Sequence, residues 1–318
     1  MTSQQLKDQV LSFSEKPKVW VFCGPGGGHG DTLIQAATIS IFGSVVIHPI
    51  HSMLGVEDSH VIVVGSGGFL DIYPRFGLML ARFSGSNDFT ILPSTIDINQ
   101  VKSLKGKTHQ IFCRDQQSYD TLEADDFNVI FCEDTVIVSG MVQINPDRAG
   151  AIHLFRNDRE SARRINTPSS FVYRNSTYED WFSSVSSAAE IHTDLLHTAI
   201  LGTLSGAEVH LYEGSTDKQK RVWAASLESL GVQFHAVDPT EAIDATNPQW
   251  HAAYEAALAV FHSLPKGKQA LWEQTRVAVE KAILSGDMEG AVEILMTTPV
   301  IYENAEADRQ LFLDLFAP

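Results

Sequence analysis

Short apolar runs alternate with amphipathic segments along the first part of the chain. Several of these runs are apolar at consecutive positions, as strands buried on both faces of a sheet are. Between them, residues 31–42 and 115–126 carry apolar side chains at helical spacing. This alternation is typical of a parallel sheet covered by helices on both sides. The predicted strands cover residues 18–24, 44–50, 60–68, 88–95, 109–115 and 128–134.

A second series of elements begins near residue 148. From about residue 245 onward the pattern is helical only. We therefore predict an α/β fold with two Rossmann-like domains, residues 1–147 and 148–318, the second of which ends in a helical tail. The second series has predicted strands at residues 150–158, 207–214 and 232–238, and predicted helices at residues 178–189, 194–206 and 217–231.

Composition narrows the class of protein. The net charge of −16 argues against a nucleic-acid partner, because a duplex-binding protein usually presents a basic face. The chain contains no run of 18 apolar residues and no secretory signal at its start, so we expect a cytoplasmic protein without a membrane span. Cys23, Cys113 and Cys132 lie far apart at the ends of apolar runs, which predicts buried, reduced thiols and no metal cage.

Two glycine-rich turns follow predicted strands. The first, residues 24–30, leads directly into a helix, an arrangement that offers free backbone N–H groups to an anion. It lacks the lysine of a Walker loop and the spacing of a dinucleotide-binding turn. The second covers residues 65–68. Two such turns at one sheet edge favour a ligand site, although each alone is also consistent with a tight connection.

Positive charge is concentrated in one short segment. Such a cluster either focuses anions into a cleft or forms a solvated basic loop. The segment contains Arg148, Arg156, Arg159, Arg163, Arg164 and Arg174.

Several short motifs follow one another between residues 19 and 237. They are the first glycine turn with Gly30-Asp31, the second glycine turn, the proline-containing strand end at residues 92–95, Arg114 with Ser118 four residues on, the acidic pair Glu133-Asp134, residues 193–197 (Thr-Asp-Leu-Leu-His) and a lysine-bearing helix start at residues 215–223. In this order they resemble the polysaccharide pyruvyltransferase family. Two positions depart from the family pattern: His29 replaces an asparagine, and Leu195 replaces an arginine.

The resemblance implies a fold and a reaction. The fold is two Rossmann-like domains facing each other across a cleft, as in the glycosyltransferase B fold. The reaction moves the three-carbon unit of phosphoenolpyruvate onto two hydroxyls of one sugar as a cyclic ketal, and releases phosphate. No cofactor or metal is implied beyond this donor. The acceptor would be a glycan or lipid-linked oligosaccharide of a bacterial exopolysaccharide or capsule, and a lipid-linked acceptor would bring the enzyme to the inner face of the membrane.

This chemistry needs an acid, a base for the hydroxyls and fixed cations for a carboxylate and a phosphate. The resemblance implies His197 as the acid, with a buried core histidine as the alternative. Asp31 would act as the base or bind a sugar hydroxyl, or simply cap its helix. Asp194 would cap the helix that begins near it or orient His197. Glu133 and Asp134 would bind sugar hydroxyls or a cation.

The remaining candidates are donor-binding residues. Arg114 and Arg156 end predicted strands, and a guanidinium binds carboxylate or phosphate through a bidentate fork. Lys218 either contributes a third cation or is a solvated helix start. The other predicted contacts are Gly27, Gly28, His29, Gly67, Gly68, Ser118 and Leu196.

Two rival functions remain open from the sequence. A nucleotide-sugar glycosyltransferase of the same fold would use the glycine turns for a diphosphate. A non-catalytic sugar- or phosphate-binding relative would have kept the fold and lost the chemistry, and Leu195 is the residue that supports this reading.

Overall fold

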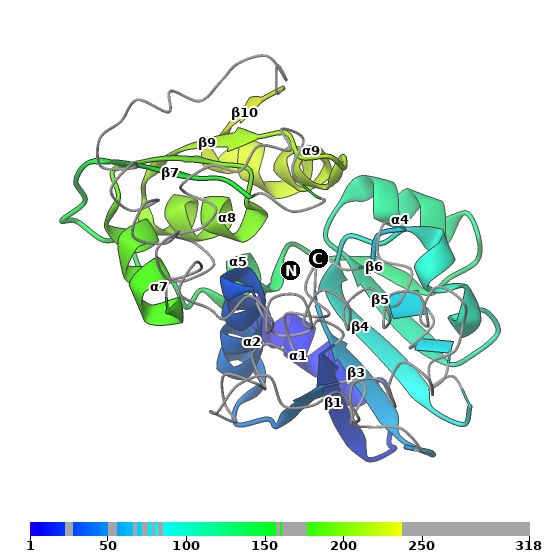
Figure 1. Ribbon diagram of the computed structural model, residues 1–318. Helices are drawn as coiled ribbons and strands as arrows, with labels where there is room; N and C mark the ends of the chain where they lie inside the picture. Colours follow the sequence, from blue (N-terminus) through cyan, green and yellow to red (C-terminus); the bar gives the residue numbers. More distant parts are fainter. Residues whose placement is uncertain are drawn as a thin grey trace, which may run out of the picture.

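The computed structural model describes residues 1–22, 28–49, 56–65, 69–71, 76–77, 80–81, 85–156, 160 and 177–236. Within these residues the chain forms two parallel sheets, one of six strands and one of four (Figure 1). The predicted mixed α/β class is therefore confirmed. The helical tail predicted from residue 245 lies outside the described residues.

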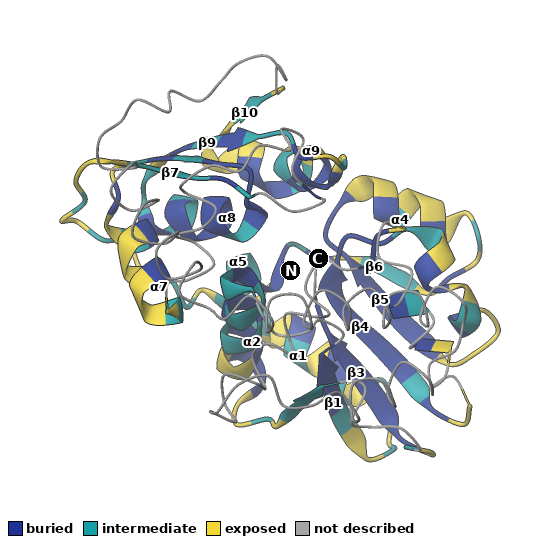
Figure 2. Cartoon of the chain, in the orientation of Figure 1, coloured by how far each residue is buried: buried dark blue, intermediate teal, exposed yellow. Residues whose placement is uncertain are grey.

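The six-stranded sheet contains the first series of strands. Its order is β2-β1-β3-β4-β5-β6, so the strand order reverses at β1, which has β2 on one side and β3 on the other. Every side chain of β3 and β5 is buried, as expected for central strands covered on both faces (Figure 2). The strands are β1 Lys18–Phe22, β2 Ile47–Pro49, β3 His60–Val64, β4 Asp88–Ser94, β5 His109–Cys113 and β6 Val129–Phe131.

Helices cover both faces of this sheet. Helices α1 (Ser3–Ser12), α2 (His29–Phe42) and α5 (Thr135–Ser139) pack on one face, and α4 (Gln116–Glu123) packs on the other. Two short 3₁₀ helices, Ile98–Gln100 and Lys102–Leu104, link β4 to β5. Cys113 and Cys132 are buried free thiols, as predicted, whereas Cys23 lies outside the described residues.

The four-stranded sheet follows the chain order β7-β8-β9-β10. Its apolar side chains, such as Ile191 and Val209, belong to the same hydrophobic cluster as side chains of the three helices that connect its strands. The strands are β7 Ala151–Leu154, β8 Glu190–Thr193, β9 Glu208–Tyr212 and β10 Gln233–His235. The helices are α7 Tyr178–Ser187, α8 Leu196–Ser205 and α9 Lys218–Val222, the last continued by a π-helical turn, Trp223–Leu227, and a 3₁₀ turn, Glu228–Leu230.

The two sheets share one hydrophobic cluster. It runs from α1 and α2 through α5 into α7 and α8, and Figure 1 shows α2 and α5 lying between the sheets. The predicted division at residue 147 falls between α5 and β7, while the cleft between two domains stays a prediction. Among the described residues, no helix combines the length and apolar character needed to cross a bilayer.

Candidate active site

Strands β1 and β3, which precede the two predicted glycine turns in the chain, are neighbours where the strand order reverses. Strand β1 pairs with β2 on one side and β3 on the other, and ligands of open parallel sheets bind at such a point. A Cβ at Gly65, directly after β3, would lie 2.5 Å from the carbonyl oxygen of Pro93. Glycine is therefore required for this close approach. Gly27, Gly67 and Gly68 lie outside the described residues.

Helix α2 begins at the same sheet edge. Gly28 is its N-cap, with extended backbone angles. The His29 ring stacks on Trp181 of α7, with centroids 5.5 Å apart. Burial raises the pKa of Asp31, and the charges of His197 and Lys218 offset part of that rise. The first turn of α2 therefore faces residues that follow the second sheet's strands.

His197 lies against this helix start. A Cβ at Gly30 would lie 2.8 Å from His197 Nδ1, so the imidazole packs directly on the backbone of α2. The side chain keeps 13% of its surface exposed, and Nε2 lies 3.4 Å from Asp134 Oδ2. Nε2 has no well-aligned hydrogen bond within the described part of the chain. The ring thus lies between α2, α5 and α8, next to the Asp134 carboxylate.

Asp134 is the carboxylate beside His197. It begins α5, where its Oδ1 accepts the Val136 N–H at 2.9 Å, and its Oδ2 accepts from Arg114 Nη1 at 2.6 Å. Burial alone would raise the pKa of Asp134, but His197, Arg114 and the backbone N–H hold it far below its usual range. Asp194 is predicted either to cap the helix that begins near it or to orient His197. Its carboxylate accepts the backbone N–H of Arg156 at 2.8 Å.

Arg114 is completely buried at the end of β5. Its Nε donates to Thr95 Oγ1 at 3.0 Å, and its Nη1 is paired with Asp134. Its Nη2 has no hydrogen-bond partner among the described residues. Buried polar groups nearly always have a partner, so this unpaired N–H group is unusual.

Two further cations lie nearby, and both bind Glu160. Lys218 Nζ and Arg156 Nη1 each donate to Glu160 Oε2. Lys218 is buried, so its interpretation as a solvated helix start is wrong. Burial lowers the pKa of Lys218, Glu160 opposes this, and the charges of Arg156 and Arg114 lower it further. The fold thus places cations that follow strands of both sheets close enough for their charges to affect one another.

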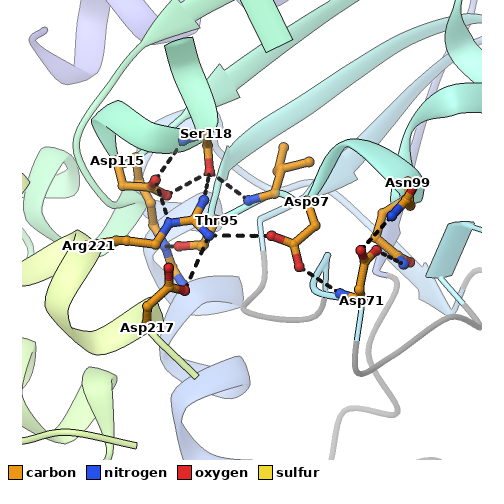
Figure 3. A network of polar contacts seen from close by, with 11 residues as sticks. Asp71, Thr95, Asp97, Asn99, Asp115, Ser118, Asp217 and Arg221 are labelled. Carbon is orange, nitrogen blue, oxygen red and sulfur yellow. Dashed lines mark hydrogen bonds and ion pairs between the residues drawn. The ribbon is translucent and has the colours of Figure 1, made fainter. Parts of the chain in front are cut away.

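Ser118 belongs to a different network, centred on Arg221 of α9 (Figure 3). Arg221 Nε donates to Asp115 Oδ1 at 2.9 Å, and Arg221 Nη2 donates to Ser118 Oγ at 2.6 Å. Ser118 Oγ also donates to Asp115 and accepts from the Ile96 N–H, so the hydroxyl is fully used within the protein. The network joins α9 to the start of α4 and thus links the two sheets. Arg221 is not among the predicted site residues, because its partners Asp115 and Ser118 lie about a hundred residues away in the chain.

Leu196 and Leu195 are both buried at the start of α8. Thr193 Oγ1 accepts the Leu195 N–H at 3.0 Å, and Gln219 Nε2 donates to the Asp194 carbonyl at 3.1 Å. These contacts fix the turn from which His197 projects. The apolar Leu195 packs in this turn where the family pattern has a charged side chain.

The chain matches the family described as polysaccharide pyruvyl transferase over residues 7–214, more than half of its length. It belongs to this family. The family is one of transferases, and its description indicates a role in polysaccharide pyruvylation. No curated protein matches the chain.

Among the solved structures that resemble this one is that of an uncharacterized protein, KP1_0663, from Klebsiella pneumoniae. The two chains are 23% identical and superpose with a TM-score of 0.59, over 74% of this chain and 100% of that chain. At this identity the likeness supports the fold alone.

Proposed function

We propose that this pyruvyl transferase moves pyruvate from phosphoenolpyruvate to two hydroxyls of one sugar in an exopolysaccharide or capsule repeat unit. The product is a cyclic pyruvate ketal, and phosphate is released. The observation that supports this most is the position of His197, which lies against Gly30 and 3.4 Å from Asp134, the partner of the buried Arg114. Family membership supplies the transferase class.

The buried cations suit the donor. Phosphoenolpyruvate carries a carboxylate and a phosphate, and guanidinium and ammonium groups bind both. The unpaired Nη2 of Arg114 is our candidate for the carboxylate. Lys218 and Arg156 are candidates for the phosphate, because Glu160 holds them in place.

His197 supplies the proton in this mechanism. A protonated imidazole gives its proton to the methylene carbon of the donor, which leaves an oxocarbenium-like carbon next to the bridging oxygen. A sugar hydroxyl attacks that carbon and loses its proton, the C–O bond to phosphate breaks, and the second hydroxyl closes the ring and loses its own proton. Asp134 stabilises the charged imidazole before transfer. Burial raises the pKa of Asp31 toward the range in which a carboxylate is an effective base for a hydroxyl.

The architecture belongs to the same proposal. We infer that residues 1–147 and 148–318 form two Rossmann-like domains of the glycosyltransferase B type, with the donor bound between them. The protein would work in the bacterial cytoplasm on a glycan or lipid-linked acceptor, the latter requiring peripheral contact with the membrane. The experiment must distinguish this pyruvyl transfer from two alternatives, a nucleotide-sugar glycosyltransferase and a non-catalytic relative.

The test is formation of the ketal itself. Purified protein is incubated with phosphoenolpyruvate ¹³C-labelled at the methylene carbon and a panel of short glycans. We expect a labelled ketal methyl signal and an equal amount of phosphate. His197→Ala should lower the rate by about 10²–10⁴-fold, the usual contribution of a general acid. A wild-type rate for His197→Ala would remove this residue as the acid.

A further inference from the structure

A row of histidines crosses the four-stranded sheet on the face opposite its helices. His153, His192 and His210 occupy paired register positions on β7, β8 and β9, and His235 follows on β10. Neighbouring rings stack, with centroids 4.5 Å apart between His153 and His192 and 4.4 Å apart between His192 and His210. Alternation along each strand places these rings on one face and Ile191 on the other.

A carboxylate lies at the centre of this row. Glu190 Oε1 is 2.7 Å from His192 Nε2 and 3.7 Å from His210 Nε2. Glu208 Oε1 is also 3.7 Å from His210 Nε2. Two imidazole nitrogens on adjacent strands therefore converge on one carboxylate oxygen, with a second carboxylate beside them.

The other nitrogen of each ring already has a partner. His192 Nδ1 lies 3.1 Å from the Tyr212 hydroxyl, and His210 Nδ1 lies 3.0 Å from His235 Nε2. When both Nδ1 atoms carry the proton and donate it to these partners, both Nε2 atoms are unprotonated and can act as ligands. Outer partners of this kind fix the tautomer of metal-binding histidines.

From this arrangement we propose that Glu190, His192 and His210 bind a Zn²⁺ ion. Two imidazole nitrogens and one carboxylate are a ligand set that zinc prefers, with water or Glu208 in the fourth position. The ion replaces the proton that otherwise joins His192 Nε2 to Glu190. Because an ion lies in the plane of each imidazole it binds, the parallel rings tilt toward each other on binding.

Charge and access favour the same site. No lysine or arginine occurs between residues 175 and 217, the segment that contains β8 and β9. The side chains of His192 and Glu190 keep 18% and 44% of their surface exposed, so an ion can reach them from solvent.

This site is separate from the one that contains His197. Ile191 and Val209, on the opposite face of the same strands, pack against Gly202 of α8, the helix on which His197 lies. The sheet therefore stands between the two sites. A zinc ion here would join β8 to β9 and stabilise the second sheet without contacting the donor.

The experiment uses the full chain, stripped of metal with a chelator and then titrated with zinc chloride in a calorimeter. We expect one zinc ion per chain and a rise in melting temperature on zinc addition. His235→Asn removes only an outer partner and should weaken zinc binding by about 10–100-fold. His192→Asn and His210→Asn each remove a ligand and should weaken it further than that.

His48→Asn is the matched control, since His48 is a partly buried histidine on β2 of the other sheet. It should bind zinc as the wild type does. Circular dichroism of each metal-free variant shows whether it folds. Glu190→Gln changes the third ligand to a side chain of nearly the same shape and is measured in the same zinc titration. The proposal is overturned if the metal-free wild type binds no zinc, or if His210→Asn and Glu190→Gln, both folded, bind zinc with wild-type affinity.

Discussion

Substituting Gly30 by alanine tests whether His197 must sit where the structure places it. The new methyl group would lie 2.8 Å from His197 Nδ1 and 3.0 Å from His197 Cβ. Ordinary contacts at such a position begin at 3.4 Å, so the ring must retreat by about 0.6 Å, the difference between 3.4 and 2.8 Å. That movement disturbs the 3.4 Å contact with Asp134 Oδ2.

The expected effect is large on catalysis and small on folding. Misplacing a reacting group by about 1 Å can cost about 10²-fold in rate, so a 10–100-fold loss of kcat is expected. Alanine in a helix is favoured over glycine by up to about 1 kcal/mol, which offsets part of the strain. We therefore expect the free energy of unfolding to change by no more than about 1 kcal/mol.

The assay is phosphate release from phosphoenolpyruvate in the presence of the acceptor, alongside urea unfolding of the same preparations. Gly85→Ala is the matched control, because a Cβ at Gly85 meets nothing within 4 Å. It should keep both wild-type rate and stability. The reasoning fails if Gly30→Ala is folded and transfers pyruvate as fast as Gly85→Ala.

Two further predictions concern stability. Arg221→Ala leaves the buried Asp115 without its cation and should lower the free energy of unfolding in urea titrations by about 3–5 kcal/mol. Arg221→Lys should recover only part of this loss, because lysine lacks the guanidinium fork. A change under about 0.5 kcal/mol for Arg221→Ala would contradict the prediction. Burial and the Lys18 charge lower the pKa of His60 from 6.5 to about 4, so the folded state favours the neutral ring. Stability from this group is present above pH 6.5 and is lost as the pH falls through 4, by at most about 3 kcal/mol, since each pKa unit corresponds to about 1.4 kcal/mol. In His60→Gln the free energy of unfolding should change less with pH between 6.5 and 4 than in the wild type, whereas His48→Gln should behave as the wild type does. An unchanged pH dependence in His60→Gln would refute the assignment.

The buried strands were the easiest part of the fold to predict. The continuous apolar runs around β1, β3, β4 and β5 are confirmed, because a strand buried on both faces leaves a local pattern that needs no tertiary information. Helix 217–231 was predicted as a single element, and the structure divides it into α9, a π-helical turn and a 3₁₀ turn. Hydrophobic periodicity does not distinguish these closely related helical forms.

The pairings within the site were harder to predict. Asp194 is predicted to cap its helix or to orient His197, whereas the carboxylate found 3.4 Å from the imidazole is that of Asp134, the N-cap of α5. Lys218 is predicted to be either a third cation of the site or a solvated helix start, and the structure buries it in a pair with Glu160. Both outcomes depend on contacts between distant segments.

The histidine row was missed for a related reason. Four strands carry a histidine at a similar place, in AIHL, EIHT, EVHLY and QFH, a repeated pattern that was visible in the sequence. Only the strand register makes three of those positions neighbours. A search for histidines at matching positions in consecutive predicted strands would have found the cluster.

Binding of phosphoenolpyruvate to the wild-type protein tests the central claim most directly. The measurement is the unfolding stability of the protein with phosphoenolpyruvate and, separately, with UDP-glucose. A ligand at a hundredfold excess over its Kd stabilises the folded state by about 2.7 kcal/mol. We predict this gain with phosphoenolpyruvate, little with UDP-glucose, and its loss in Lys218→Met. Stabilisation by UDP-glucose alone, or by neither ligand at millimolar concentration, would contradict the account.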